Sequence, residues 1–131
     1  LLEKKLIEPE ELAEGIALFR GIKRRLDLKT NASSVLVYEG FGSSYEKARA
    51  ALEAIRLHFP TRRLVTIFEP HTFSWRNKDS LHWYDNVFNT SSRVFIYEPA
   101  EQGARTHLQL TQKEIVNRVK KAGVKATAIV S

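Results

Sequence analysis

Three segments of the sequence end in a glutamate that follows an aromatic residue, and a carboxylate is a side chain suited to binding and acid–base chemistry. The segments are Tyr38-Glu39-Gly40, Phe68-Glu69-Pro70 and Tyr97-Glu98-Pro99, so the glutamates are spaced by 30 and then 29 residues. That spacing matches one strand-and-helix unit. Because ligands of open α/β sheets bind beyond the carboxyl ends of the strands, we expect the three glutamates to line one crevice. Alternatively, each glutamate merely ends a strand in solvent.

A second candidate is the loop Gly40–Ser44, which is expected to join a strand to the start of a helix. Backbone N–H groups and the helix dipole make such a point attractive for an anion. The loop lacks the third glycine of a dinucleotide fingerprint and the Gly-Lys-Ser/Thr of a P-loop, so it predicts no phosphate cradle. No Gly-x-Ser-x-Gly elbow is present, so no serine nucleophile is expected. The alternative is a tight turn with a helix cap. The binding candidates around this loop are Glu39, Gly40, Gly42, Ser43 and Ser44.

The stretch Pro70–Asn77 (PHTFSWRN) places many polar and aromatic residues directly after a predicted buried strand. His71 can donate or accept a proton, and Arg76 can bind a carboxylate or a phosphate, so both are candidate catalytic residues. The alternative is a structural loop in which Trp75 closes the edge of the domain. The binding candidates in this region are Glu69, His71, Thr72, Ser74 and Arg76.

Metal and covalent chemistry are less favoured by the sequence. The set Glu39, Glu69, His71 and His107 contains no closely spaced pair of ligands, so no metal site is expected. The chain has no cysteine, which excludes disulfides, thiolate nucleophiles and cysteine-bound zinc.

Composition limits the class of protein. A chain of 131 residues with 43% hydrophobic and 27% charged residues fits one compact domain, residues 1–131. It has no apolar run of about 20 residues and no recognisable signal peptide, so we expect a cytoplasmic protein without a membrane partner. The net charge is +6, but the basic residues are scattered. Nucleic acid is therefore disfavoured as a partner, while the phosphates of a nucleotide or sugar nucleotide would fit.

The elements that must position these residues alternate along the chain. Near-continuous apolar runs predict buried parallel strands, and they are Val35–Glu39, Leu64–Phe68, Val94–Tyr97 and Ala126–Val130. Because helices separate them, we predict a Rossmann-like, doubly wound α/β fold with a mostly parallel sheet and flanking helices. The charged segment Lys23–Leu28 predicts an edge strand near the N-terminus. The chain stops directly after a strand, so we expect the natural domain to continue.

Helix signals support this order. The apolar spacing in Glu46–Phe59 predicts a helix, with Ser43 and Glu46 as a capping box. Thr111 and Glu114 predict a second capping box, before a helix that Gly123 stops. A third helix is predicted over Lys78–Phe88 with Asn77 as its cap, and a fourth runs through Leu12, Ile16 and Phe19.

Several segments, taken in order, resemble the carboxy-terminal domain of the Mur ligase family. Phe19–Asp27 resembles its opening Phe-x-Gly-Val-x-x-Arg-x-Glu segment, and Val37–Leu52 resembles a strand, an Asp-Asp-Tyr-x-His-His-Pro loop and a helix with an Arg-Ala-x-Leu register. Phe59–Leu64 and Phe68–His71 are similar to the next strand and its Pro-His-Arg-Tyr-Ser loop. The resemblance runs from about Phe19 to Val130 and is strongest to the UDP-N-acetylmuramate–alanine ligase and murein tripeptide ligase branches.

The resemblance implies an ATP-dependent amide ligase of peptidoglycan metabolism, in which a carboxylate is activated as an acyl phosphate and attacked by an amine. It implies ATP and Mg²⁺ as cofactors, bound mainly by central and amino-terminal domains that are absent from this chain and are its partners. UDP-N-acetylmuramate and an amino acid or peptide are the implied substrates. This domain would position substrate and ATP, and the isolated chain would be inactive.

The sequence departs from the family pattern at the first loop. Glu39–Tyr45 (EGFGSSY) replaces Asp-Asp-Tyr-x-His-His-Pro, so the second acid, both histidines and the proline are changed. His71 is not followed by arginine, although Arg76 lies nearby. Two other functions therefore stay open: a non-catalytic, Rossmann-like module that binds a nucleotide or anion, and a structural or interaction domain.

Overall fold

The computed structural model describes residue 4 and residues 6–30, 32–99 and 109–130. The chain divides into two compact units, Leu1–Glu39 and Gly40–Ser131, and each is described here by itself. Helix α1 (Pro9–Leu18) belongs to unit 1 and agrees with the helix predicted through Leu12 and Ile16. Its Glu8 N–H donates to Glu11 Oε2 at 2.8 Å. No residue of α1 is buried.

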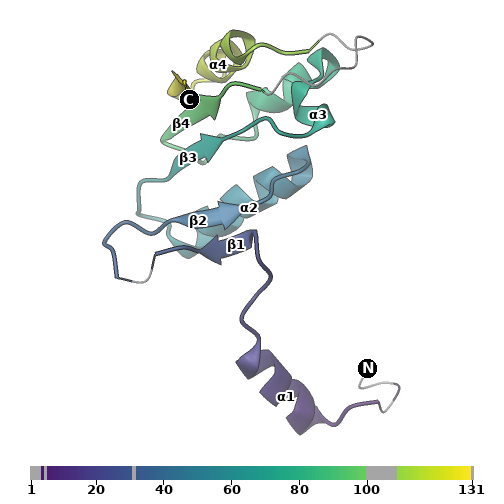
Figure 1. Ribbon diagram of the computed structural model, residues 1–131. Helices are drawn as coiled ribbons and strands as arrows, with labels where there is room; N and C mark the ends of the chain where they lie inside the picture. Colours follow the sequence, from purple (N-terminus) through teal and green to yellow (C-terminus); the bar gives the residue numbers. More distant parts are fainter. Residues whose placement is uncertain (1–3, 5, 31, 100–108, 131) are drawn as a thin grey trace. The chain divides into compact units, whose positions relative to one another are not determined.

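Strands β1 (Arg25–Leu28) and β2 (Tyr38–Gly40) pair in a two-stranded sheet, and their arrows run in opposite directions in Figure 1. The predicted edge strand is therefore present. The prediction of a buried parallel strand over Val35–Glu39 is wrong, because Val35 and Val37 are exposed and β2 pairs with β1. The Thr30 hydroxyl accepts from the Val37 N–H at 3.1 Å and donates to the Val35 carbonyl at 3.2 Å. These local bonds take backbone groups that a sheet ladder would use.

Unit 2 contains a parallel sheet of three strands in the order β3 (Val65–Phe68), β4 (Arg93–Tyr97) and β5 (Ala126–Ile129). Thr66 lies beside Val94, and Val94 beside Ala126. Three of the four predicted parallel strands are thus confirmed. The helices that flank them are α2 (Tyr45–His58), α3 (Phe73–Arg76), η1 (Lys78–Asp85) and α4 (Gln112–Lys121). The Rossmann-like α/β class predicted from the sequence is confirmed.

The capping boxes have different outcomes. At α4 the predicted box is present: the Glu114 N–H donates to Thr111 Oγ1 at 3.2 Å, and the Thr111 N–H donates to Glu114 Oε2 at 2.8 Å. At α2 the cap is Ser44 and not Ser43. Ser43 belongs to the preceding turn, because its N–H donates to the Phe41 carbonyl at 2.9 Å.

The segment after β3 is more helical than the sequence suggested. The short helix α3 was predicted as loop, and η1 is a 3₁₀ helix that ends before the predicted Phe88. Asn77 caps η1 as predicted, since its side chain accepts from the Asp79 N–H at 3.0 Å. An eight-residue 3₁₀ helix is long for its type.

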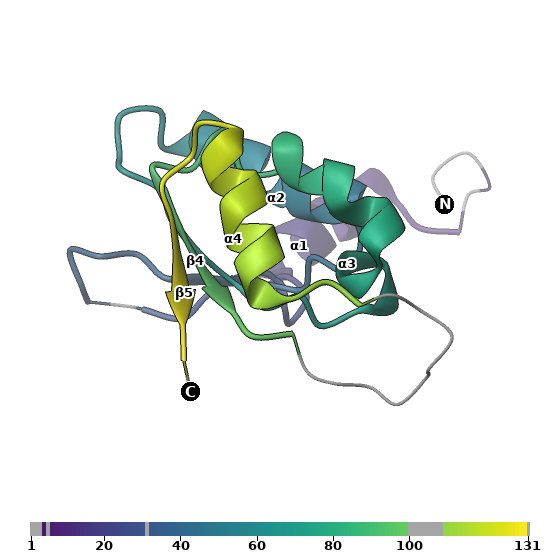
Figure 2. The same ribbon diagram turned by 90° about the horizontal axis from the view of Figure 1, so that it is seen from above.

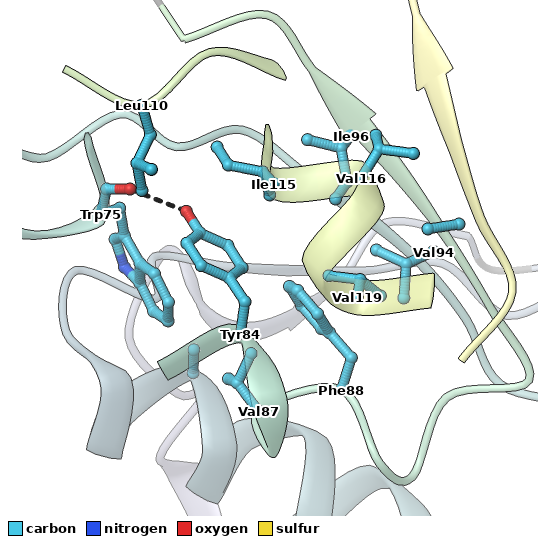
Figure 3. Packing of buried hydrophobic residues seen from close by; sticks show 12 residues of the cluster. Trp75, Tyr84, Val87, Phe88, Val94, Ile96, Leu110, Ile115, Val116 and Val119 are labelled. Carbon is cyan, nitrogen blue, oxygen red and sulfur yellow. Dashed lines mark hydrogen bonds between the residues drawn. The ribbon is translucent and has the colours of Figure 1, made fainter. Parts of the chain in front are cut away.

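The core of unit 2 lies between the sheet and its helices, as Figure 3 shows. Val94 and Ile96 of β4 pack with Ile115 and Val119 of α4, and all four are fully buried. A ring cluster continues the core on the side of α3 and η1, with contacts between Trp75, Tyr84, Phe88 and the partly buried Phe68. The Tyr84 hydroxyl donates to the Trp75 carbonyl at 2.7 Å, the dashed line in Figure 3. Burial raises the pKa of Tyr84, so this hydroxyl keeps its proton.

Candidate functional site

The carboxyl ends of β3 and β4 bring two of the three glutamates to one edge of the sheet. Phe68 and Ile96 are register partners near the ends of these neighbouring strands, so Glu69, directly after Phe68, and Glu98, two residues after Ile96, both follow the carboxyl ends of adjacent strands. Both glutamates are exposed. Glu39 lies in unit 1, where its carboxylate binds Lys29 Nζ at 2.8 Å and Arg24 Nε at 3.6 Å. The membership of Glu39 in one crevice with the other two stays a prediction.

Two hydrogen bonds tie the loop before α2 to the segment after β3. Thr72 Oγ1 donates to the Ser43 carbonyl at 3.1 Å, and Trp75 Nε1 donates to the Gly42 carbonyl at 2.7 Å. A side chain at Gly42 would meet Ala48, because a Cβ built there lies 3.0 Å from the Ala48 Cβ. The two loops predicted to carry function therefore lie next to each other, and Gly42 lets its own loop pack closely against α2.

His71 is the proton-transfer candidate of this edge. Its Nδ1 lies 3.4 Å from Glu69 Oε1, and both side chains are more than half exposed. Its backbone N–H also donates to the Glu69 carbonyl at 2.8 Å, which holds the two residues in one tight turn. A carboxylate beside one ring nitrogen favours the tautomer with a proton there, leaving Nε2 able to accept a proton from a bound ligand.

Arg76 lies at the end of α3 and is buried, and its role as a binding residue stays a prediction. It was predicted in a loop as a binder of carboxylate or phosphate, but it is only 7% exposed. Its Nε donates to the Thr72 carbonyl at 3.4 Å, and its own carbonyl accepts from the Leu110 N–H at 2.7 Å. Arg76 thus braces the turn between α3 and the segment before α4. Trp75 is 1% exposed, as the alternative of a loop closed by this tryptophan required.

The start of α2, predicted as an anion site, is partly occupied by the protein's own groups. The pKa of Glu46 is lowered by hydrogen bonds from its own backbone N–H and from the Ser44 hydroxyl. The Glu46 carboxylate thus already uses the positive end of the helix. On the other side of the loop, Lys47 Nζ donates to Ser43 Oγ at 3.1 Å. Lys47 supplies a cation that sequence reasoning missed, and its position four residues after Ser43 was the available signal.

Gln112, at the start of α4, is a second residue that sequence reasoning missed. Its Nε2 donates to the Ile96 carbonyl at 2.7 Å and to the Ile129 carbonyl at 2.8 Å. One side-chain amide therefore fixes the carboxyl ends of β4 and β5. Nothing in the sequence marks this role beyond the place of Gln112 directly after the cap Thr111.

The remaining candidates divide into polar ligands and metal ligands. The Ser74 side chain is half-buried, and the Thr72 hydroxyl is already used on Ser43. His107 lies outside the described residues. Within the part of the chain that the structure describes, no group of three or more histidine or acidic side chains could hold a metal ion. No described helix is long and apolar enough to cross a membrane.

Fold and edge together define the class: a Rossmann-like α/β domain with polar loops gathered at the carboxyl ends of its parallel strands. No family model matches the chain. It is 40% identical over 68 residues, 52% of its length, to a UDP-N-acetylmuramate–L-alanine ligase of Roseiflexus. It is 29% identical over 124 residues, 94% of its length, to the ligase of that name from Desulfitobacterium hafniense. It spans only 14% and 27% of these two relatives.

Solved structures agree in fold. The UDP-N-acetylmuramate–alanine ligase of Thermotoga maritima superposes with a TM-score of 0.76 and 18% identity, over 98% of this chain and 26% of that one. A murein peptide ligase of Psychrobacter arcticus gives a TM-score of 0.66 and 21% identity, over 90% of this chain and 24% of that one. The recognition of a Mur ligase domain, first made on the sequence motifs, is confirmed.

Proposed function

We propose that this chain is the carboxy-terminal domain of an ATP-dependent amide ligase of peptidoglycan synthesis or recycling, in the cytoplasm. The complete enzyme would join an amino acid or peptide to UDP-N-acetylmuramate. Relatives named UDP-N-acetylmuramate–L-alanine ligase, one of them aligned over 94% of the chain, support this proposal. The whole activity belongs to a longer protein, because the chain spans about a quarter of that relative.

The observation that carries the proposal is the pair of tied loops. The bonds from Thr72 and Trp75 hold the Gly42–Ser43 backbone against the turn that bears His71. The Lys47 Nζ donates to the hydroxyl of Ser43 in the same loop. A cation and a proton acceptor at one sheet edge suit a phosphate, or the carboxylate of an amino acid, arriving from outside the domain.

We propose that the cofactors are bound mainly outside this domain. ATP supplies the energy by turning the substrate carboxylate into an acyl phosphate. This chain contains no lysine-bearing glycine loop to cradle phosphates, and its described residues form no metal-ligand cluster. We therefore assign the binding of ATP and Mg²⁺ mainly to other domains. The residues that we assign to positioning the substrate, at the carboxyl edge of the parallel sheet, are Ser43, Ser44, Lys47 and His71.

The test uses the longer ligase that carries this domain. His71→Ala and Glu69→Gln should lower turnover by roughly 10- to 1000-fold, as expected for the loss of a positioned proton acceptor and its carboxylate. Both side chains are more than half exposed, so the melting temperature should not change. Lys113→Gln, an exposed change on α4, is the control and should keep normal turnover. Normal turnover in both site variants would refute the assignment.

A non-catalytic nucleotide- or anion-binding module is the second candidate, favoured by the loss of the family's acid, histidines and proline from the first loop. Titration calorimetry of the isolated chain with ATP separates the two. The ligase domain alone should bind ATP no more tightly than about 1 mM, a free energy of roughly −4 kcal/mol, and should not hydrolyse it. Binding at about 1 μM would support the second candidate instead.

A further inference from the structure

The first residue of α4, Gln112, bonds to the carboxyl ends of two strands at once. Its Nε2 donates to the Ile96 carbonyl of β4 at 2.7 Å and to the Ile129 carbonyl of β5 at 2.8 Å. The register between these strands ends with Tyr97 beside Ile129, so the amide bonds where the strand pairing stops. Figure 2 shows the first turn of α4 beside the arrowheads of β4 and β5. A side-chain amide has two N–H groups, and both are used here on strand ends.

Strand β4 is one of the two strands that lead into the candidate site. Glu98 directly follows Tyr97, the last residue of β4. The neighbouring strand β3 leads to Glu69, whose carboxylate lies 3.4 Å from His71 Nδ1. The end of β4 therefore sets where Glu98 leaves the sheet relative to the His71 turn, and Gln112 bonds to the β4 backbone just before that point.

The segment before Gln112 is tied to the turn that bears His71. The Leu110 N–H donates to the Arg76 carbonyl at 2.7 Å, and Arg76 Nε donates to the Thr72 carbonyl at 3.4 Å. Thr72 directly follows His71. The start of α4 is thus bonded on one side to the ends of β4 and β5, and on the other side to the His71 turn. All these groups belong to unit 2, so the connection does not depend on unit 1.

We propose that Gln112 is a positioning residue of the ligase reaction, because its two hydrogen bonds fix where Glu98 and His71 stand at the carboxyl edge of the sheet. This role rests on the proposed function, and Gln112 acts through the residues that it positions. Without the amide, the end of β4 and the start of α4 lose the bonds that join them. A displacement of about 1 Å at a reacting centre can slow a reaction on the order of 100-fold. A purely structural role would instead lower only the amount of folded protein.

The experiment uses the longer ligase that carries this domain. Gln112→Met removes both N–H groups and keeps an unbranched side chain of similar length. Its kcat per folded molecule should fall roughly 10- to 100-fold, while KM for ATP stays unchanged because ATP is assigned mainly to other domains. Val119→Ala is the matched control, since it weakens the buried face of the same helix and leaves the Gln112 bonds in place. It should keep the normal kcat per folded molecule, with the folded fraction taken from circular dichroism melts.

Two further variants sharpen the test. Gln112→Asn is one methylene shorter and cannot reach both carbonyls, so it should also lower kcat, and it gives the same comparison if Gln112→Met does not fold. Gln112→Arg should recover part of kcat, because a guanidinium can donate to several carbonyls, as Arg56 does to three in this chain.

A normal kcat per folded molecule in Gln112→Met or Gln112→Asn would overturn the positioning role alone, and so would an equal loss of kcat in Val119→Ala. Absence of amide-bond formation by the wild-type ligase would overturn the proposed function and this role with it. The two failures are therefore distinguishable.

Discussion

Replacing Trp75 by phenylalanine should weaken unit 2 more than any other conservative aromatic change in the ring cluster. The indole is 1% exposed, and its Nε1 donates to the Gly42 carbonyl at 2.7 Å. Losing this donor leaves a carbonyl without its partner, which costs about 1–3 kcal/mol. The phenyl ring is also smaller by roughly 40 Å³, and at about 24 cal/mol per Å³ of residual cavity that adds about 1 kcal/mol. The sum is about 2–4 kcal/mol.

Urea denaturation followed by far-ultraviolet circular dichroism is the assay. With a slope of about 2 kcal/mol per molar, the midpoint should fall by about 1–2 M. Trp83→Phe is the matched control, because Trp83 is only partly buried and its indole makes no hydrogen bond in the described ranges. It should cost less than about 1 kcal/mol. Equal midpoints for the two variants would show that the bond to Gly42 does not hold the loops together.

Three further predictions follow from single contacts. Gly42→Ala should lower the free energy of unfolding by about 1–3 kcal/mol, because its Cβ would lie 3.0 Å from the Ala48 Cβ. Gly15→Ala, with open space around it in α1, should raise the free energy of unfolding by up to about 1 kcal/mol. Thermal melts compare the two variants. The hydrogen bond from Arg118 lowers the pKa of Asp85 below 3.8, so the ion pair should stabilise the fold above pH 3.8 and lose this effect as the pH falls through the lowered pKa. In thermal melts between about pH 2 and about pH 5, Asp85→Asn should therefore show a smaller change of melting temperature with pH than the wild type. Thr111→Ala removes the cap of α4 and should cost about 1 kcal/mol in urea denaturation, and an unchanged midpoint would contradict the capping role.

The parallel strands and the α4 cap were predictable because each rests on residues close in sequence. The run Val94–Tyr97 is apolar on both faces, and Thr111 reaches Glu114 within one turn. The strand predicted over Val35–Glu39 failed for the opposite reason. Its apolar residues resemble a buried strand, but the Thr30 side chain engages the backbone at Val35 and Val37.

The sequence predicted where individual residues of the candidate site lie, but not the contacts that those residues make with distant parts of the chain. Residue types placed Glu69 and His71 at a strand end, and the structure puts them there. Sequence could not show that Arg76 is buried, since an arginine in a polar stretch has no local signal for burial. It also could not show that Gln112 bonds two strand ends, because those carbonyls lie 16 and 17 residues away along the chain.

The two tryptophans of this protein form one close pair, with ring centres 5.4 Å apart in an edge-to-face arrangement. Trp75 is the residue whose indole bonds to the loop before α2, so the chromophore and the site share a hydrogen bond. Near-ultraviolet circular dichroism and tryptophan fluorescence therefore act as a built-in optical reporter of that loop. Unit 1 contains no tryptophan, so it is silent in the tryptophan fluorescence. Ligands that move the loop become detectable on the unlabelled protein.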